Sequence, residues 1–437
     1  MLDFIRKLIP ERSPIRLWYH KISAIFAAIF WRFPSEKLKV IAVTGTSGKS
    51  TTVEIIHHIL QNSGKKCGAL STIQFHIGDK VLPNKTLRTT LRPWDIHKML
   101  RKMVSAKCEY VVIEVSSHAI DQHRLWGVNV DTAVLTNVYD NEHLDYHGTF
   151  TDYLKTKEKL FKNLNYNSRK PNVRKQMVLN HDSEYFENFA DFTADKIWTF
   201  AKQNQADIRA ENTEFSAKKI SFDIRVPNNS AHIEVPMVGQ HNLENLLCAI
   251  ATATSAEISM ETIAKTLKNL PGIPGRLESI DLGQPFSVIV DFSYKPSALK
   301  AVLNSLTELT DGRIIVIWGG AGGRHIENWQ ESAKVIDEIA DEFILTTDDP
   351  GMTDPKEISK IIRAEISREE ANNFFEIEDR YEAIRYAIYT AQPGDTVLIA
   401  GRGHEKTQTI GKKKIKFDDR EIAREILQFT AKHGLKD

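Results

Sequence analysis

The chain has 437 residues, of which 41% are hydrophobic and 26% are charged, as is usual for a soluble globular protein. A single hydrophobic core stops growing well before this length, so two or three domains are expected. The net charge of +1 gives no basis for nucleic-acid binding. The three cysteines form no CxxC pair, which argues against a disulfide framework or a zinc site and fits a reducing cytoplasm.

The first 37 residues contain an apolar stretch, 22–33, bordered by Lys21 and Arg32. About twelve residues are too few to span a bilayer as a helix, and no small-residue cleavage site follows, which argues against a signal peptide. Two interpretations stay open. The favoured one is a helix packed on the next domain. The other is an interfacial helix in peripheral contact with a membrane, with Trp18 and Trp31 at the headgroups.

The next part of the chain alternates short apolar runs with helical patterns. Strands are expected at 38–44, 110–115 and 132–137, and helices at 51–62 and 94–105. Buried strands that alternate with helices predict a parallel sheet with helices on both faces. Residues 215–238 alternate apolar and polar side chains around Pro-Asn-Asn, which predicts an antiparallel hairpin added to this sheet.

Asn269-Leu-Pro-Gly-Ile-Pro-Gly275 is the strongest punctuation in the chain and predicts a hinge or linker. A second strand–helix alternation follows it, with strands expected at 286–292, 313–318, 342–347 and 396–400. The predicted fold class is α/β: a central P-loop ATPase domain with a mostly parallel sheet, plus a smaller Rossmann-like α/β C-terminal domain. The expected boundaries are 1–37 for an apolar and basic helical segment, 38–268 for the central domain and 269–437 for the C-terminal domain.

Val43-Thr-Gly-Thr-Ser-Gly-Lys-Ser-Thr51 follows a strand and opens a helix, as a phosphate-binding loop must. Its two glycines let backbone N–H groups turn toward phosphate oxygens. Lys49 can reach the terminal phosphates, and Ser50 offers a hydroxyl to Mg²⁺. Val43 stands where the strict pattern has its first Gly, so the loop is a variant. The alternative is a glycine-rich turn with a chance Lys-Ser pair.

Three further features lie between this loop and residue 160. Glu114 ends a predicted buried strand, where a carboxylate faces the ligand crevice of an open α/β sheet and can bind Mg²⁺. It could equally cap the following helix. Asn141-Glu-His-Leu-Asp-Tyr-His-Gly148 holds two His and two acids, as a polar site or a surface loop would. Lys157 lies between Lys155 and Lys159, and residue type alone predicts a solvated helix face.

Together these motifs resemble the Mur ligase family over about 38–428. Gly-Thr-Ser-Gly-Lys-Ser-Thr matches the phosphate loop of the family, including its missing first Gly. Glu-Val-Ser-Ser-His-Ala and Glu-His-Leu-Asp-Tyr-His-Gly are similar to the branch that forms tripeptides on UDP-N-acetylmuramoyl-L-alanyl-D-glutamate. Gly-Arg-Gly-His-Glu405 and Phe-Asp-Asp-Arg420 resemble further signatures of that branch.

The resemblance implies a role for each matching residue, with Lys157 on the position of a carbamylated lysine. The implied catalytic residues are Lys49, Glu114, His143 and Lys157, and the implied ligands of two Mg²⁺ ions are Ser50, Glu114, His143 and Lys157. The implied ATP contacts are Gly45, Thr46, Ser47, Gly48, Lys49, Ser50, Thr51, Asn242, Asn245, Arg276 and Asp291. The acceptor positions are Thr89, Thr90, Ser116, Gln122 and Arg124, and the amino-acid positions are Arg324, Asp348, Asp349, Gly401 and Glu405. For Asn242 and Asn245, helix capping is the alternative.

The resemblance also implies an activity. It is that of an ATP-dependent, ADP-forming ligase that joins an amino acid to the D-Glu carboxylate of a muramoyl-L-Ala-D-Glu acceptor through an acyl-phosphate, in peptidoglycan biosynthesis. The expected partners are the muropeptide and the amino acid, without nucleic acid, for a cytoplasmic monomer. Closure about the 269–275 linker would exclude water from the acyl-phosphate. A non-catalytic nucleotide-binding regulatory protein and a related peptide ligase with a different acceptor are the alternatives.

Four departures from the family pattern bear on the substrates. The 37 residues before the first strand are too few for the UDP-binding domain of the family, so the acceptor is expected to bind through peptide and sugar or to carry a different or lipid-linked group. Diaminopimelate-adding members carry Asp-Asn-Pro-Arg, where this chain has Asp348-Asp-Pro-Gly351. Gly cannot pair with a distal carboxylate, whereas Asp349 can meet a distal amine, which slightly favours lysine over diaminopimelate. Tyr294 replaces a family His, and 325–329 differ from the family, so that only Arg324 aligns there.

Overall fold

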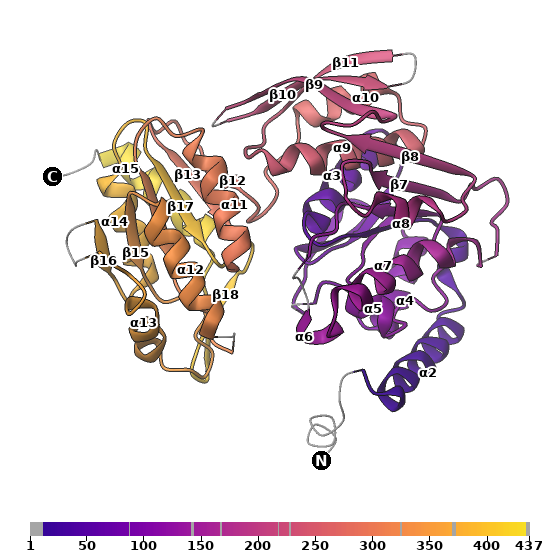
Figure 1. The fold of residues 1–437 in the computed structure, drawn as a ribbon, viewed down its shortest axis with the longest axis horizontal. Coiled ribbons are helices and arrows are strands. Elements are labelled where there is room, and N and C mark those ends of the chain that lie inside the picture. Colours follow the sequence, from indigo (N-terminus) through magenta and orange to yellow (C-terminus); the bar gives the residue numbers. More distant parts are fainter. Residues whose placement is uncertain are drawn as a thin grey trace. The chain divides into compact units, whose positions relative to one another are not determined.

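The computed structural model describes residues 12–86, 88–140, 144–166, 168–216, 218–226, 229–323, 326–368 and 373–433. These residues form two compact units (Figure 1). Unit 1 comprises 1–213, 221–234 and 242–270, and unit 2 comprises 214–220, 235–241 and 271–437. In the part of the chain described, no helix is long and apolar enough to cross a membrane.

Unit 1 is built on one large sheet with the strand order β11-β10-β9-β8-β7-β6-β1-β5-β2-β3-β4. Pairing is parallel from β9 through β1 and β5 to β2, and antiparallel from β2 through β3 to β4. The strands are β1 Lys39–Thr44, β2 Cys67–Leu70, β3 Gln74–Ile77, β4 Lys80–Pro83, β5 Tyr110–Glu114, β6 Thr132–Leu135, β7 Gln176–Asn180, β8 Lys196–Ala201, β9 Ile208–Phe215, β10 Ile220–Val226 and β11 Asn229–Val235. The predicted turn of the added hairpin lies outside the described residues.

Helices cover both faces of this sheet, as its continuously buried central strands require. The helices α4 and α7 pack on one face through Leu100, Tyr153 and Phe161, whereas α3 contacts β1, β2 and β5 (Figure 1). The helices of unit 1 are α2 Pro14–Phe30, α3 Lys49–Asn62, α4 Pro93–Ser105, α5 Ser117–Asp121, α6 Leu144–His147, α7 Phe150–Lys162, α8 Phe186–Ala190, α9 His241–Ser255 and α10 Met260–Lys268, with 3₁₀ turns at Pro34–Lys37 and Asn163–Asn165.

A buried ion cluster fixes the amino ends of β1 and β6. Asp131 accepts from the backbone N–H of Val40 at 2.8 Å, and its two oxygens also pair with Lys170 and Lys175. The Nζ of Lys175 bonds Asn129 Oδ1 at 2.7 Å as well. All three charged side chains are nearly inaccessible, and each of the two cations has carbonyl partners besides the carboxylate, as a buried charge must.

Unit 2 has a smaller sheet in the order β12-β13-β17-β14-β15-β16, parallel except for β12. Its strands are β12 Glu278–Ser279, β13 Ser287–Asp291, β14 Ile314–Trp318, β15 Glu342–Leu345, β16 Phe374–Glu376 and β17 Thr396–Ala400, with a separate ribbon of β18 Thr407–Ile410 and β19 Lys413–Lys416. One face packs on α11 Pro296–Thr307, α12 Ile326–Ile339 and α13 Pro355–Arg363, and the other on α14 Arg380–Thr390 and α15 Asp419–His433. The predicted α/β fold with two unequal sheets is confirmed.

Candidate active site

The predicted phosphate loop joins β1 to α3, and its two glycines are required by their neighbours. Gly48 has φ +75°, and a Cβ there would lie 2.0 Å from Asn245 Oδ1. A Cβ on Gly45 would lie 1.9 Å from Thr136 Oγ1. Any larger residue would push away the side chains that frame the loop. The backbone therefore turns tightly between strand and helix. This turn places backbone N–H groups at the amino end of α3, and the amino end of a helix is a site where anions bind.

Two neighbouring elements of unit 1 hold this loop in shape. Asn137, just beyond β6, accepts from Ser47 N through Oδ1 at 2.9 Å. Its amide donates to Glu244 Oε1 at 2.9 Å, which links the loop to α9. In the first turn of α9, Asn245 donates to Asn242 Oδ1 at 3.0 Å. Of the two asparagines that the family resemblance singled out, Asn245 therefore lies against the phosphate loop at Gly48, and Asn242 is bonded to Asn245.

An oxygen-lined site lies at the start of α3. Ser50 Oγ donates to Glu114 Oε1 at 2.9 Å, while Thr72 donates to Oε2 through both its N–H (2.6 Å) and its hydroxyl (2.9 Å). Glu114 is 2% exposed. Helix α5 is capped instead by Ser116, whose Oγ accepts from Ala119 N, so the capping interpretation of Glu114 is wrong.

The donor set at this site suits a hard cation, because hydroxyl and carboxylate oxygens are the ligands that Mg²⁺ prefers. Within the described ranges, no three His, Cys, Asp or Glu side chains converge closely enough to hold a metal without other ligands. A cation at Ser50 and Glu114 would therefore need oxygens from elsewhere, such as those of phosphate groups. His143, a third predicted ligand, lies outside the described residues, as does Arg324.

Two lysines converge on the carbonyl of Gly45. Lys49 Nζ donates to it at 3.0 Å and to Thr46 O at 2.8 Å, and Lys157 Nζ donates to it at 2.7 Å. Lys157 is only 1% exposed, and its Nζ lies 4.6 Å from the centre of the Tyr153 ring. Burial, reinforced by the Lys49 cation, lowers the pKa of Lys157 well below its usual value. The solvated helix face expected from residue type is therefore wrong.

Four of the five predicted acceptor residues cluster beside β5. Thr90 Oγ1 donates to Glu114 O at 3.0 Å and accepts from Ser116 N at 2.9 Å. Arg124 donates to Gln122 Oε1 from Nε at 3.0 Å and to Thr90 O from Nη1 at 2.8 Å. These contacts place a guanidinium and two hydroxyls next to the Glu114 strand end. The fifth residue, Thr89, is half-buried beside Thr90.

A histidine neighbours this cluster that the predictions did not include. His147 is fully buried and bonds Ser117 Oγ through Nε2 at 2.9 Å. Burial, together with the nearby His118 and Arg12, lowers the pKa of His147 to about 4, so the ring is neutral at pH 7. A neutral imidazole can accept or donate a hydrogen bond there without adding charge to the buried site.

In unit 2, Arg276 and Asp291 lie close together at the carboxyl end of β13. Asp291 accepts from Leu277 N and Ser293 N, both at 2.7 Å. The Arg276 guanidinium lies 4.8 Å from the centre of the Phe292 ring. His404 packs on the same ring, and its pKa is lowered to about 3 by burial and by the positive charge of Arg276.

The remaining predicted residues gather at the carboxyl ends of β15 and β17. A Cβ on Gly401 would lie 2.4 Å from Asp348 Oδ2, so glycine is needed for this approach. Asp348 is buried 3.8 Å from Arg402, which also lies 4.0 Å from Glu405. Burial raises the pKa of Asp348 despite the nearby cations of Arg380 and Arg402. Asp349 Oδ1 accepts from Thr409 N at 2.8 Å, which leaves its other oxygen for a further partner.

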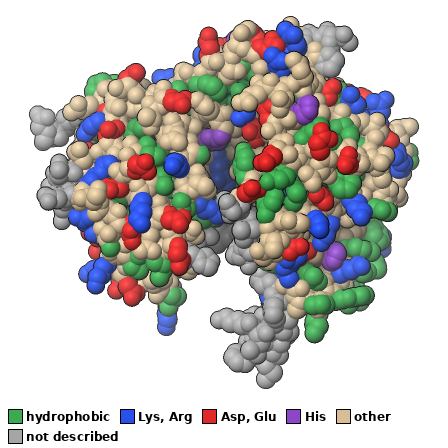
Figure 2. Space-filling view, in the orientation of Figure 1, with side chains coloured by type: hydrophobic (Ala, Val, Ile, Leu, Met, Phe, Trp, Pro, Cys, Tyr) green, Lys and Arg blue, Asp and Glu red, His purple; other side chains and the backbone are tan. Residues whose placement is uncertain are grey.

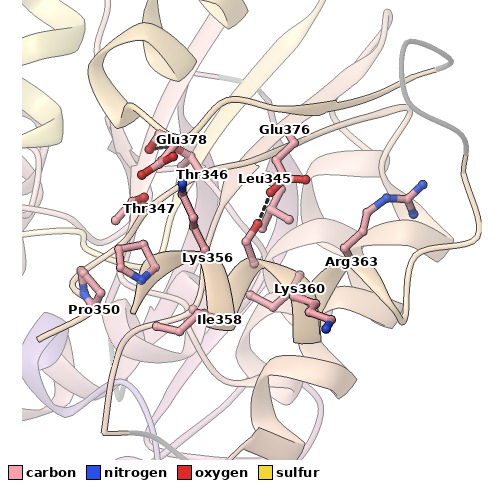
Figure 3. Close-up of a pocket in the computed structure, with 14 residues that line it drawn as sticks. Leu345, Thr346, Thr347, Pro350, Lys356, Ile358, Lys360, Arg363, Glu376 and Glu378 are labelled. Carbon is pink, nitrogen blue, oxygen red and sulfur yellow. Dashed lines mark hydrogen bonds between the residues drawn. The ribbon is translucent and has the colours of Figure 1, made fainter. Parts of the chain in front are cut away.

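A cavity of about 460 Å³ lies on the other side of this segment, between α13 and the ends of β15 and β16 (Figure 3). Its wall carries Leu345, Pro350 and Ile358, with Lys356 from α13 opposite Glu378. None of the predicted site residues lines it. This cavity therefore does not coincide with the polar clusters that carry the predicted chemistry.

Several features of these clusters were missed from the sequence: the burial of Lys157, which was predicted only as a site residue, and the contacts of four other residues. The run Tyr153, Leu154, Lys157, Leu160, Phe161 has the spacing of one buried helix face, which places Lys157 inside. Arg402 lies within the quoted Gly-Arg-Gly-His motif. Tyr146 likewise lies within the quoted Glu-His-Leu-Asp-Tyr-His-Gly motif. Thr72 and Asn137 had no such signal, because each acts through a contact between segments distant in sequence.

Comparisons with known proteins agree with this arrangement. Residues 43–253 match the model of the Mur ligase middle domain, and 275–403 match that of the Mur ligase, glutamate ligase domain. The UDP-N-acetylmuramoyl-L-alanyl-D-glutamate--2,6-diaminopimelate ligase of Geobacillus kaustophilus is 40% identical over 92% of this chain and 81% of its own length. The Listeria monocytogenes ligase of the same name is 35% identical, over 92% of this chain and 80% of its own length.

Solved structures extend the comparison. A UDP-N-acetylmuramoyl-L-alanyl-D-glutamate--2,6-diaminopimelate ligase superposes with a TM-score of 0.66 at 29% identity, covering 90% of this chain and 79% of that one. E. coli FolC, in complex with DHPP and ADP, gives a TM-score of 0.67 at 16% identity, covering 94% and 93%, which is a likeness of fold alone. The two matching domain models and the identity to these ligases, spread over nine-tenths of the sequence, show that the chain belongs to the Mur ligase family.

Proposed function

We propose that this chain is an ATP-dependent ligase that joins an amino acid to the D-Glu carboxylate of a muramoyl-L-Ala-D-Glu acceptor, releasing ADP and phosphate in peptidoglycan biosynthesis. One observation carries the proposal. A buried Ser50–Glu114 oxygen pair and two lysines, Lys49 and Lys157, surround a phosphate loop, with the Arg124 cluster directly beside them. The names of the relatives support the acceptor.

The residues of unit 1 suit phosphoryl transfer to a carboxylate. A carboxylate is a poor electrophile, so the γ-phosphoryl of ATP is first transferred to the D-Glu oxygen. Lys49 offsets the charge that develops on the phosphoryl oxygens. The incoming amine then attacks the acyl-phosphate carbon and loses a proton, and phosphate leaves. Mg²⁺, held by Ser50 and Glu114, would supply further charge neutralisation at the phosphates. Two ions fit the family pattern.

Lys157 is proposed to carry a carbamate. Only a neutral amine can attack CO₂, and the lowered pKa of Lys157 favours the neutral form. The C–N bond forms as one proton leaves, which converts a buried amine into an anionic oxygen donor beside the phosphate loop. Intact-mass measurement at neutral pH with bicarbonate tests this step: a gain of one carboxyl group on Lys157 is expected, and Lys157→Met must not show it.

The incoming amino acid is proposed to bind at the Asp348 cluster of unit 2. The names of the relatives favour meso-diaminopimelate. Gly351, which stands where diaminopimelate-adding members have an Arg, favours L-lysine. The Asp349 oxygen that does not bond Thr409 N would then accept a hydrogen bond from the distal ammonium of lysine. We rank diaminopimelate first, and kcat/KM measured with both amino acids decides between them.

The test is phosphate release from ATP with a panel of muropeptide acceptors and amino acids, with and without UDP on the acceptor. Release that depends on both co-substrates, with ADP as the nucleotide product, supports the proposal. Production of AMP would rule out the acyl-phosphate route. Tight ATP binding without turnover on any acceptor would favour a nucleotide-binding regulatory role.

With its cysteines free and buried, the chain is proposed to work in the cytoplasm. We propose further that it works as a monomer.

A further inference from the structure

Helix α2 turns its large apolar side chains outward. Seven residues form a stripe along one side of the helix, which we call the α2 stripe: Ile15, Trp18, Tyr19, Ile22, Phe26, Ile29 and Phe30. Each is between 44% and 72% exposed. Their spacing of three or four residues places them on a single helix face. Hydrophobic side chains gather over α2 at the lower right of Figure 2.

The opposite side of α2 holds the helix to unit 1 with small residues. Ala24, Ala27 and Ala28 are fully buried, and the helix packs against α4. Gly127 admits this close approach, because a Cβ there would lie 2.5 Å from Ala28 Cβ. The helix is thus anchored through its small side chains and the half-buried Leu17 and Ile25, and presents most of its large side chains to the surroundings. A helix that served only the core would have the reverse arrangement.

The charge around the α2 stripe has one dominant sign. Residues 12–33 contain four Lys and Arg and no Asp or Glu. Arg12 pairs with Asp121 and Asp152, which leaves Arg16, Lys21 and Arg32 as the cations of this segment. Trp94 of α4 extends the stripe, since its ring lies 4.7 Å from that of Phe30. Lys98 and Lys102 follow Trp94 at one-turn intervals on the same exposed face of α4. A second copy docked stripe to stripe would bring these cations together, which disfavours self-association.

We propose that the α2 stripe docks on the surface of an anionic phospholipid bilayer. Helix α2 is not long and apolar enough to cross a membrane. It can lie in the interface, with its apolar face among the acyl chains and the cations at the headgroups. The aromatic rings of Trp18 and Tyr19 suit that interfacial zone. The inference does not depend on the ligase function, although docking there would bring the protein to acceptors carried on lipids.

Co-sedimentation of the full chain with vesicles tests the proposal. We expect binding to vesicles containing about 30% phosphatidylglycerol, with little binding to pure phosphatidylcholine, and a decrease as salt rises. The double variant Trp18→Ser/Phe26→Ser should weaken binding at least about tenfold, because two large apolar side chains no longer leave water. The control Leu282→Ser/Ile415→Ser changes two exposed apolar residues of unit 2 and should bind as the wild type does.

Other outcomes would overturn the proposal. They are failure of the wild type to sediment with anionic vesicles, and equal binding by the stripe variant. A lipid-free dimer in analytical ultracentrifugation that the stripe variant abolishes, without vesicle binding, would assign the surface to a second copy instead. Circular dichroism and phosphate release with a soluble acceptor, measured in parallel, separate a loss of docking from a loss of folding or of activity.

Discussion

Replacement of Lys157 by Met separates a chemical role of this lysine from a structural one. The side chain is 1% exposed, and the structure gives it one hydrogen bond, to Gly45 O. That carbonyl keeps Lys49 as a partner, so the lost bond should cost only about 1 kcal/mol. Met fills much of the same volume and removes a buried amine. The free energy of unfolding should therefore change by no more than about 1 kcal/mol.

Activity should respond quite differently. Loss of the amine on which a carbamate would form should lower kcat for phosphate release at least about a hundredfold, comparable to the loss of one preorganised electrostatic group. Urea unfolding and phosphate release on the same preparation give both numbers, with the exposed Lys155→Met as the matched control. In Lys157→Ala, formate or acetate should restore part of the activity. Activity within threefold of wild type, or a stability loss above about 3 kcal/mol, would refute the reasoning.

Three other expectations concern the same domain. Glu114→Gln should lower the rate of phosphate release at least about a hundredfold and shift its Mg²⁺ dependence to higher concentration. The reason is that an amide oxygen still accepts from Thr72 but carries no charge to bind the ion. An unchanged Mg²⁺ titration would contradict this. Gly48→Ala should weaken ATP binding, measured by calorimetry, at least about tenfold. The double variant Gly48→Ala/Asn245→Ala should recover only part of the lost affinity, because it removes the clash with Asn245 but keeps alanine at a positive φ. Burial lowers the pKa of His57 to about 3 in the folded chain, against an ordinary value of 6.5, so between these pH values the unfolded chain binds more protons. As pH falls below 6.5, the wild type should therefore lose stability relative to His57→Phe, by at most about 1.4 kcal/mol per pH unit. The same difference in unfolding free energy between the two proteins at pH 7 and at pH 5, measured in urea, would disprove this.

The α/β architecture could be predicted from the sequence, because fully buried parallel strands read as continuous apolar runs. The expected runs at 38–44 and 396–400 became β1 and β17, with boundaries within one residue. Strand β4, at the edge of the sheet, carried no such signal, since it is exposed throughout. Its neighbour β3 has only four residues, of which two are buried. Strand β16, only three residues long, was also too short to show a pattern.

The site was only partly readable for a different reason. The phosphate loop is contiguous, so its spacing alone marks it. Glu114 was left between two interpretations because only the folded chain brings Thr72 and Ser50 to its two oxygens. Helix α2 was expected to pack on the next domain, and it does, but the sequence did not reveal that three alanines make that contact while Trp18 stays outside.

The ion cluster around Asp131 has a consequence for the opposite end of the sheet. By bonding Val40 N, Asp131 sets how far β1 is advanced along β6, with Ile41 beside Thr132 and Thr44 beside Leu135. That alignment brings Thr136 and Asn137 alongside the phosphate loop, where both bond Ser47. A slippage by one residue would reverse every side chain of β1 between the two faces. The shape of the phosphate loop thus depends on the ion cluster at the far end of β1. We expect substitutions in that cluster to lower activity even though none of its residues contacts a substrate.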